Sequence, residues 1–140
     1  MIKMGTTIKS IPTQATWPLR RAVMWPDKPL DYIKLPQDHL GMHFGLFRDE
    51  ELVTVASLFI IDNKAQFRKL ATRTSEQGKG YGSLMLEHLL KVADSKGVEK
   101  IWCNARKEKT GFYHKMGLTE TAQTFSKGNI NYVVMEKMLP

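Results

Sequence analysis

Apolar and polar positions alternate along residues 39–47, and an alternation with a period of two is typical of a strand. One face of this segment carries Leu40, Met42, Phe44 and Leu46. Residues 52–61 are rich in β-branched side chains and apolar on both faces, which predicts a central strand. The turn residues 62–64 then lead into a further strand over 65–72.

Residues 80–96 change to helical spacing and predict the main helix. Its apolar stripe consists of Met85, Leu86, Leu89 and Ala93. Gly97 suits the residue that follows a helix C-terminus. A second helix is expected over 13–25, with Pro18 near its first turn. Prolines at 26, 29 and 36 then predict an irregular connection.

The remaining segments complete the order β, α, β-β-β, α, β, α, β-β. Strands are expected over 2–9, 98–105, 118–126 and 130–138, and a short helix over 108–116. The strand over 98–105 follows a helix, so we expect it to lie parallel to an earlier strand. The order predicts an α/β fold, a mixed sheet with helices on its faces, in a single domain over residues 1–140.

Composition agrees with a globular protein, at 42% hydrophobic and 25% charged residues. The net charge of +7 favours anionic partners or only reflects solvating lysines, and both interpretations stay open. The single cysteine, Cys103, allows no internal disulfide and is compatible with a reducing cytoplasm. The longest apolar run is too short to span a bilayer, and the N-terminus lacks the apolar core of a signal peptide. We therefore expect a cytoplasmic protein with no membrane partner.

Three glycines, Gly78, Gly80 and Gly82, stand where the main helix should begin. A helix N-terminus binds anions through its free N–H groups, and glycines allow close approach to the backbone. Two common phosphate loops do not fit. Tyr81 stands where a Walker loop needs lysine, and Ser83 stands where the dinucleotide fingerprint needs glycine.

Residues 77–82, QGKGYG, match the Q/R-x-x-G-x-G/A signature of the Gcn5-related N-acetyltransferases (GNAT). A strand precedes the motif, a helix and a strand follow it, and residues 112–117, FYHKMG, resemble the family segment FYxKxGF, with Leu118 in place of phenylalanine. The "NAR" before that segment resembles the ElaA-like branch. The resemblance implies a mostly antiparallel, twisted sheet of six to seven strands, splayed at a central parallel pair.

The resemblance also implies acetyl-coenzyme A as co-substrate. The residues matched to its pyrophosphate are Gln77, Gly78, Lys79, Gly80, Tyr81 and Gly82. The backbone of Leu70 and Thr72 would pair with pantetheine, and Asn104 would bond pantetheine or cap the next helix. Arg106 and Lys109 replace the asparagine and alanine common in the family and add two cations for a 3′-phosphate.

Acyl transfer needs a neutral amine, an oxyanion donor and a proton for the thiolate. An alkylamine is only about 0.1% neutral at pH 7. By resemblance the Leu70 N–H is the oxyanion donor and Tyr113 the general acid. Neither Gln66 nor Arg68 can act as a base on its strand.

His39 and His43 remain as candidate bases, on one face of the predicted strand. No third metal ligand accompanies them, so no metal is expected. If Arg68 faces the acceptor, it favours a carboxylate or phosphate on the amine; a structural ion pair is the alternative. Arg68 and His43 are thus the candidate substrate residues.

These features predict direct acetyl transfer to a primary amine through a ternary complex. The acceptor is a small molecule or a protein, and the sequence does not say which. A coenzyme A-binding sensor with degenerate catalysis is the alternative. No recognition motif for nucleic acid is present, so none is expected as a partner. The family resemblance allows a homodimer.

Overall fold

The computed structural model describes residues 5–140, and these form a seven-stranded sheet in the order β1-β2-β3-β4-β5-β7-β6. The strands are β1 Thr6–Ser10, β2 Met42–Arg48, β3 Glu51–Ile61, β4 Lys64–Thr72, β5 Lys100–Arg106, β6 Thr119–Lys127 and β7 Ile130–Met138. Every neighbouring pair is antiparallel except β4 and β5, which are parallel. The predicted mixed sheet and its central parallel pair are confirmed.

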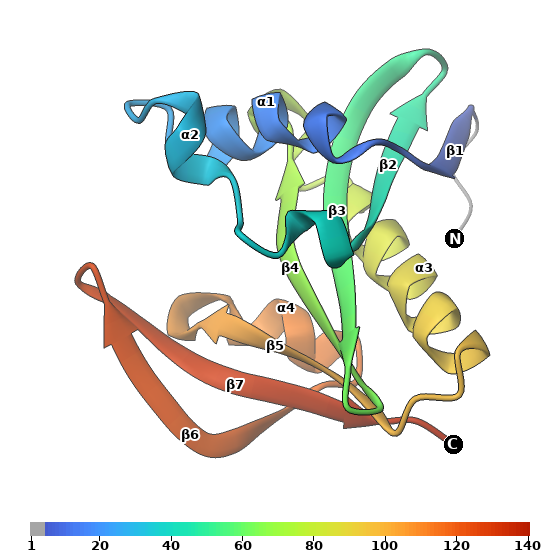
Figure 1. Cartoon of the computed structure of the whole chain (residues 1–140), viewed down its shortest axis with the longest axis vertical. Coiled ribbons are helices and arrows are strands. Elements are labelled where there is room, and N and C mark those ends of the chain that lie inside the picture. Colours follow the sequence, from blue (N-terminus) through green and yellow to red (C-terminus); the bar gives the residue numbers. More distant parts are fainter. Residues whose placement is uncertain (1–4) are drawn as a thin grey trace.

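The parallel pair is short. Only residues 64–66 of β4 pair with residues 100–102 of β5. Beyond that point the strands separate, and Figure 1 shows β4 (green) and β5 (orange) running apart. The sheet is therefore splayed at its centre, as the resemblance implies.

Helices cover both faces of the sheet (Figure 1). The helices are α1 Thr13–Met24, α2 Leu30–Ile33, α3 Tyr81–Ser95 and α4 Thr110–Lys115. Val55 packs in a cluster with Leu19 of α1, whereas its neighbour Ala56 packs in the main cluster with α3. Because successive strand residues point to opposite faces, α1 and α3 lie on opposite sides. Among residues 5–140, no helix is long and apolar enough to cross a membrane.

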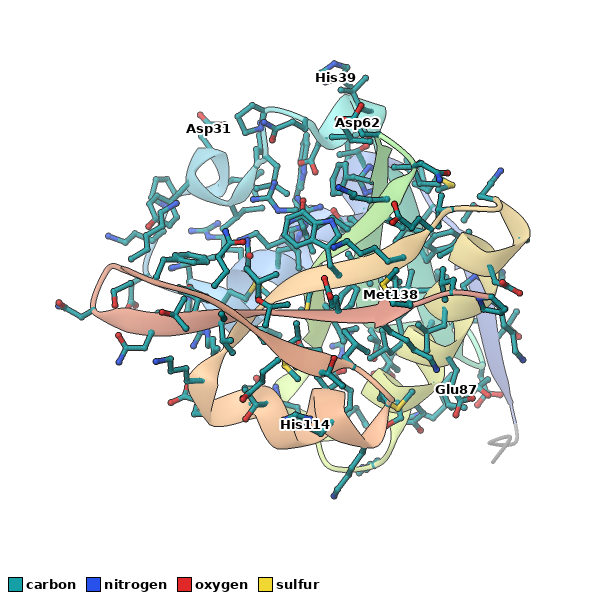
Figure 2. All side chains as sticks on the ribbon, turned by 90° about the horizontal axis from the view of Figure 1, so that it is seen from below. Asp31, His39, Asp62, Glu87, His114 and Met138 are labelled. Carbon is teal, nitrogen blue, oxygen red and sulfur yellow. The ribbon has the colours of Figure 1, made fainter. Side chains whose placement is uncertain are left out.

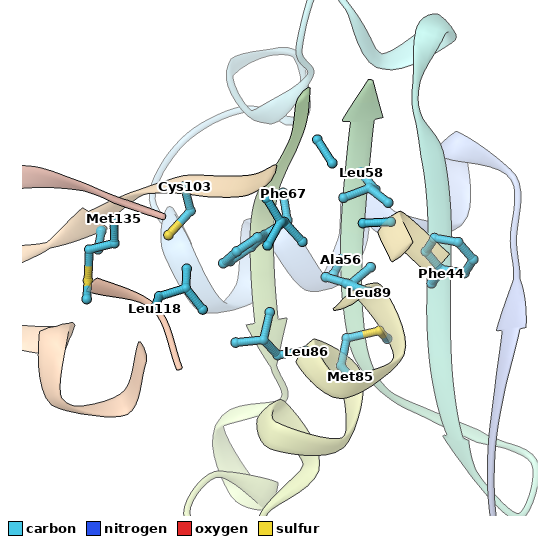
Figure 3. Close-up of a cluster of buried hydrophobic side chains, with 14 of the residues drawn as sticks. Phe44, Ala56, Leu58, Phe67, Met85, Leu86, Leu89, Cys103, Leu118 and Met135 are labelled. Carbon is cyan, nitrogen blue, oxygen red and sulfur yellow. The ribbon is translucent and has the colours of Figure 1, made fainter. Parts of the chain in front are cut away.

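The main core lies between α3 and the sheet (Figure 3). The predicted stripe of α3 is confirmed, because Met85, Leu86, Leu89 and Ala93 are all fully buried. Phe112 and Tyr113 of α4 pack against the same cluster. This core joins the two halves of the sheet beneath the region where their strands separate.

The strand predicted from residue 39 begins later, at Met42. Residues Asp38–Leu40 form a short 3₁₀ helix instead, and Leu40 is 67% exposed. The reason is tertiary: the buried Asp38 carboxylate accepts hydrogen bonds from Arg20 and from the Leu35 N–H, which hold this segment as a turn. The alternation before Met42 was therefore misleading.

Two further expectations differ from the structure near the N-terminus. Pro18 lies in the second turn of α1 and not in its first, so the helix lacks one backbone donor there. The connection expected to be irregular contains α2, which begins after Pro29. The first strand was expected over 2–9; it spans Thr6–Ser10, and residues 1–4 lie outside the described part of the chain.

Candidate active site

A cleft of about 890 Å³ opens where β4 and β5 separate. Its walls come from β4, from the loop and first turn of α3, from the end of β5 and from α4, and also from the end of α1 and the β6–β7 hairpin. The predicted site residues that line it are Arg68, Leu70, Thr72, Gln77, Gly78, Gly80, Tyr81, Gly82, Asn104 and Tyr113. Lys79, His39 and His43 are not among its lining residues. The fold thus gathers most of the predicted site from four separate segments.

The glycine loop is held in a backbone conformation that suits glycine. Gly78 has φ 78° and Gly80 has φ 88°, both in the left-handed region. Gly80 is the N-cap of α3, and its carbonyl accepts the Leu84 N–H at 3.1 Å. The Gln77 side-chain amide donates to the Thr72 carbonyl at 3.0 Å and ties the loop to β4. The positive end of the α3 dipole therefore faces the cleft, as an anion site requires.

Gly82 is different, because its backbone is helical and needs no glycine. A Cβ built there would lie 3.6 Å from the Phe112 ring and 3.9 Å from Thr72 Oγ1, which are ordinary contacts. Both neighbours line the cleft. The surrounding protein could therefore accommodate alanine at this position. Because Gly82 has no side chain, it leaves free space in the cleft wall.

A charged cluster links the loop to the end of β2. The Glu76 carboxylate accepts a hydrogen bond from Arg48 at 2.7 Å and one from Lys79 at 2.9 Å. These two bonds, Arg48 first, lower the pKa of Glu76 to about 2. Lys79 was expected to offer a charge to the phosphates. In the structure its ammonium is paired with Glu76 and does not line the cleft.

A β-bulge interrupts β4 beside the cleft. Val55 pairs with Ala71 and Ser57 pairs with Arg68, so Lys69 and Leu70 together oppose Ala56. Lys69 has φ 58°, which is uncommon for a residue with a side chain. Bulges leave the extra residue unpaired and redirect the strand. The backbone around Leu70 is thereby taken out of the regular ladder, at the position where an oxyanion donor was predicted.

Tyr113 lies on α4 with its ring packed against Phe67 and Phe112, at centroid distances of 5.8 and 5.1 Å. No hydrogen bond holds its hydroxyl within residues 5–140. Burial raises the pKa of Tyr113, and Cys103 raises it further, against a smaller opposite effect of Arg106. The phenol is therefore protonated and free to donate a hydrogen bond into the cleft.

Asn104 does not cap a helix. The residue before the 3₁₀ helix Lys107–Lys109 is Arg106, and the N-cap of α4 is Lys109; neither makes a side-chain capping bond. The capping alternative for Asn104 is therefore wrong, and its exposed amide lines the cleft. Arg106 and Lys109, the two predicted extra cations, line it as well.

The histidines lie elsewhere. His43 is buried, and its ring nitrogens are 2.7 Å from Ser57 Oγ and 2.7 Å from the Asp38 carbonyl oxygen. His39 is exposed on the 3₁₀ helix, and Figure 2 shows its side chain projecting from the molecule. These contacts give His43 a structural role. Neither the His39 ring nor the His43 ring lines the cleft. Within residues 5–140, no group of three or more potential metal ligands is present.

Two features in and near the cleft were missed from the sequence. Arg20 is fully buried and forms a bidentate pair with Asp38, with distances of 2.9 and 3.0 Å. Lys69 and Trp25 line the cleft together, with the lysine ammonium 4.3 Å from the indole centroid. One signal in the sequence could have indicated the second feature: two consecutive cations, Arg68 and Lys69, stand inside a strand that is otherwise half apolar.

The family model described as the Acetyltransferase (GNAT) family matches residues 12–118. The chain therefore belongs to this family, and the prediction of an N-acetyltransferase is confirmed at that level. Direct comparison shows 29% identity over 142 residues with the uncharacterized N-acetyltransferase YitI of Bacillus subtilis (strain 168), covering 94% of this chain and 95% of YitI.

Solved structures agree on the fold. A candidate N-acetyltransferase of Lactobacillus plantarum superposes with a TM-score of 0.87 at 21% identity, over 97% of this chain and 99% of that one. A GNAT family acetyltransferase of Elizabethkingia anophelis, with acetyl-CoA bound, gives a TM-score of 0.76 at 17% identity, over 98% and 100% of the two chains. The finer resemblance to the ElaA-like branch stays a prediction.

Proposed function

We propose that this chain is a single N-acetyltransferase domain that transfers the acetyl group of acetyl-CoA directly to a primary amine within a ternary complex. The observation that supports this proposal is that the glycine loop at the start of α3 and Tyr113, whose hydroxyl makes no hydrogen bond within residues 5–140, line the same cleft in the split of the sheet. The acetyl-CoA-bound structure of the Elizabethkingia anophelis enzyme, which shares the fold, supports acetyl-CoA as co-substrate.

Under this proposal, each wall of the cleft would hold a different part of the co-substrate. The backbone at Gly78, Gly80 and Gly82 would receive the pyrophosphate at the positive end of α3. Leu70 and Thr72 would offer strand backbone to the amide groups of pantetheine, and Asn104, which lines the cleft from β5, would donate or accept a further hydrogen bond. Lys79 would act indirectly, through its ion pair with Glu76.

In the chemical step, the amine nitrogen bonds to the thioester carbonyl carbon and the carbon–sulfur bond breaks. The N–H of Leu70, which lies at the bulge, would stabilise the oxyanion. Tyr113 would donate its proton, or a strong hydrogen bond, to the leaving sulfur and recover it from solvent. The surplus proton of the amine leaves to water, because among residues 5–140 no histidine lines the cleft and the one lining carboxylate, Glu76, is paired with cations.

The test is release of free thiol from acetyl-CoA over a panel of primary amines. Tyr113→Phe should lower kcat by about 100-fold or more, within the range for a general acid, while acetyl-CoA still binds. Tyr32→Phe is the matched control, because Tyr32 is 54% exposed and lies outside the cleft. Equal kcat for the Tyr113→Phe and wild-type proteins would contradict the role of Tyr113.

A coenzyme A-binding sensor is the second candidate. It is favoured by one observation: in the described part of the chain, no histidine lines the cleft, and its one lining carboxylate, Glu76, is paired with cations. Tight acetyl-CoA binding with no turnover on any amine would select this alternative.

A further inference from the structure

Two half-buried cations of the cleft have no anionic partner among the described residues. Arg68 makes no hydrogen bond or ion pair with any residue in 5–140, so the structural ion pair considered for it is not found. The Lys69 ammonium lies 4.3 Å from the centroid of the Trp25 ring, and within residues 5–140 it forms no hydrogen bond or ion pair. Cations that are removed from water are ordinarily paired with an anion, and neither Arg68 nor Lys69 has such a partner.

The nearest carboxylate cannot supply that partner. Asp38 already receives both guanidinium nitrogens of Arg20, which also donates to Ser57 Oγ at 2.9 Å. The Arg20–Asp38 pair is neutral as a unit. Arg68 and Lys69 are therefore left without compensation on the adjoining stretch of β4.

The electrostatic consequence appears in both side chains. Burial lowers the pKa of Arg68, Arg20 lowers it further, and only Asp38 opposes this. Burial lowers the pKa of Lys69 to about 8, followed by the charges of Arg68, Arg20, Lys127 and Arg106. An anion bound between these two side chains would stabilise their charged forms and so raise both pKa values.

The position of the two cations separates them from the coenzyme phosphates. The phosphate loop follows the C-terminal end of β4, after Thr72, whereas Arg68 precedes Leu70 by two residues, or roughly 7 Å along a strand. The acetyl group would lie at Leu70 under the proposed function. Arg68 and Lys69 thus lie on the far side of the reaction centre, toward α1 and Trp25.

We propose that the acceptor is an anionic amine, whose carboxylate or phosphate group pairs with Arg68 and Lys69 while its amino group faces the thioester. This inference rests on the proposed function. The cleft as a whole fits it, because its lining within residues 5–140 includes five basic residues, Arg68, Lys69, Arg106, Lys109 and Lys127, against the single carboxylate of Glu76. Polyamines and other polycations would meet like charge there and are disfavoured.

The experiment compares amines that differ only in the anion. Ethanolamine is paired with phosphoethanolamine, and propylamine with β-alanine; 1,3-diaminopropane provides a dication. At pH 7, we expect kcat/KM at least tenfold higher for the anionic member of one pair. The pair that shows the preference tells phosphate from carboxylate.

Variants then locate the anion. Arg68→Gln should bring the ratio of kcat/KM between pair members to near unity, and Arg68→Lys should keep part of it. Lys69→Met, which removes the charge at similar volume, should lower the ratio independently if Arg68→Gln fails to fold. Lys91→Gln is the control, because Lys91 is an exposed cation of α3 outside the cleft and its loss should leave the ratio unchanged.

The outcomes separate this inference from the proposed function. If neutral amines or the diamine are turned over as well as the anionic amines, the acceptor is not an anionic amine, and the proposed acetyltransferase function still stands. A preference that survives both Arg68→Gln and Lys69→Met overturns the assigned site. Binding of acetyl-CoA without turnover of any amine overturns the proposed function, and the inference with it.

Discussion

Replacing Gly82 with alanine should change stability and coenzyme binding in opposite directions. Gly82 is the second residue of α3, where a Cβ meets no atom closer than 3.6 Å. Alanine in a helix is about 0.5–1 kcal/mol more favourable than glycine, because less backbone freedom is lost on folding. For a domain of this size, that gain raises Tm by roughly 2–4 °C.

The same methyl group would occupy the cleft wall beside Phe112 and Thr72, where the pyrophosphate is proposed to approach. We expect the affinity for acetyl-CoA to fall about tenfold or more, which corresponds to about 1.4 kcal/mol. Calorimetric titration with acetyl-CoA measures the affinity, and thermal unfolding without ligand measures the stability. A more stable protein that binds its co-substrate more weakly is the expected result.

Two other glycines serve as controls. Gly111 is also helical and does not line the cleft, and a Cβ added there would have no neighbouring atom within 4 Å, so Gly111→Ala should stabilise without changing affinity. Gly78 has equal space but a φ of 78°, so Gly78→Ala should destabilise the protein by about 1 kcal/mol. If Gly82→Ala raises Tm and binds acetyl-CoA as tightly as the wild type, the pyrophosphate does not approach the start of α3 closely, and the reasoning is refuted.

Four further predictions concern the core and the charged groups. Leu89→Ala should lower the free energy of unfolding by about 2–5 kcal/mol in denaturant titrations, because Leu89 is fully buried. Glu76, whose pKa is about 2 in the fold, should stabilise the wild type relative to Glu76→Gln above pH about 4.5, and this difference should vanish as the pH falls toward 2. Lys69 has its pKa lowered to about 8, so the unfolded chain binds more protons above that pH; stability should rise between pH about 8 and about 10, and Lys69→Met should remove that rise. Cys103, buried and with its pKa raised to about 12, should not react with a thiol reagent until the protein unfolds.

Local periodicity predicted the regular elements well, because burial on one face leaves a direct trace in the sequence. The α3 stripe is an example, and so is the strand predicted over 52–61, which is found as β3, Glu51–Ile61. The glycine loop was predictable for another reason. Positive φ angles and a helix N-terminus restrict which residues can stand at Gly78 and Gly80.

Features that depend on long-range partners were not predictable in this way. The turn at Asp38 exists because Arg20, eighteen residues earlier, binds it. His43 is not positioned as a base, because its ring nitrogens are hydrogen-bonded to Ser57 and to the Asp38 carbonyl. Glu76 binds Arg48, twenty-eight residues earlier, as well as Lys79. Each case turns on a hydrogen bond that sequence spacing alone does not specify.

The short pairing of β4 with β5 also affects how firmly the chain resists local opening. After residue 66 of β4 and residue 102 of β5, these two strands no longer pair across the divide, so the middle of the sheet formed by residues 5–140 has two free edges. Such edges ordinarily exchange their amide protons quickly and invite other strands to add. An extended molecule rich in amide groups would bridge them like an extra strand. Bound co-substrate would then connect the parts of β4 and β5 that do not pair with each other. Amide hydrogen exchange along residues 67–72 should therefore slow as the co-substrate concentration rises.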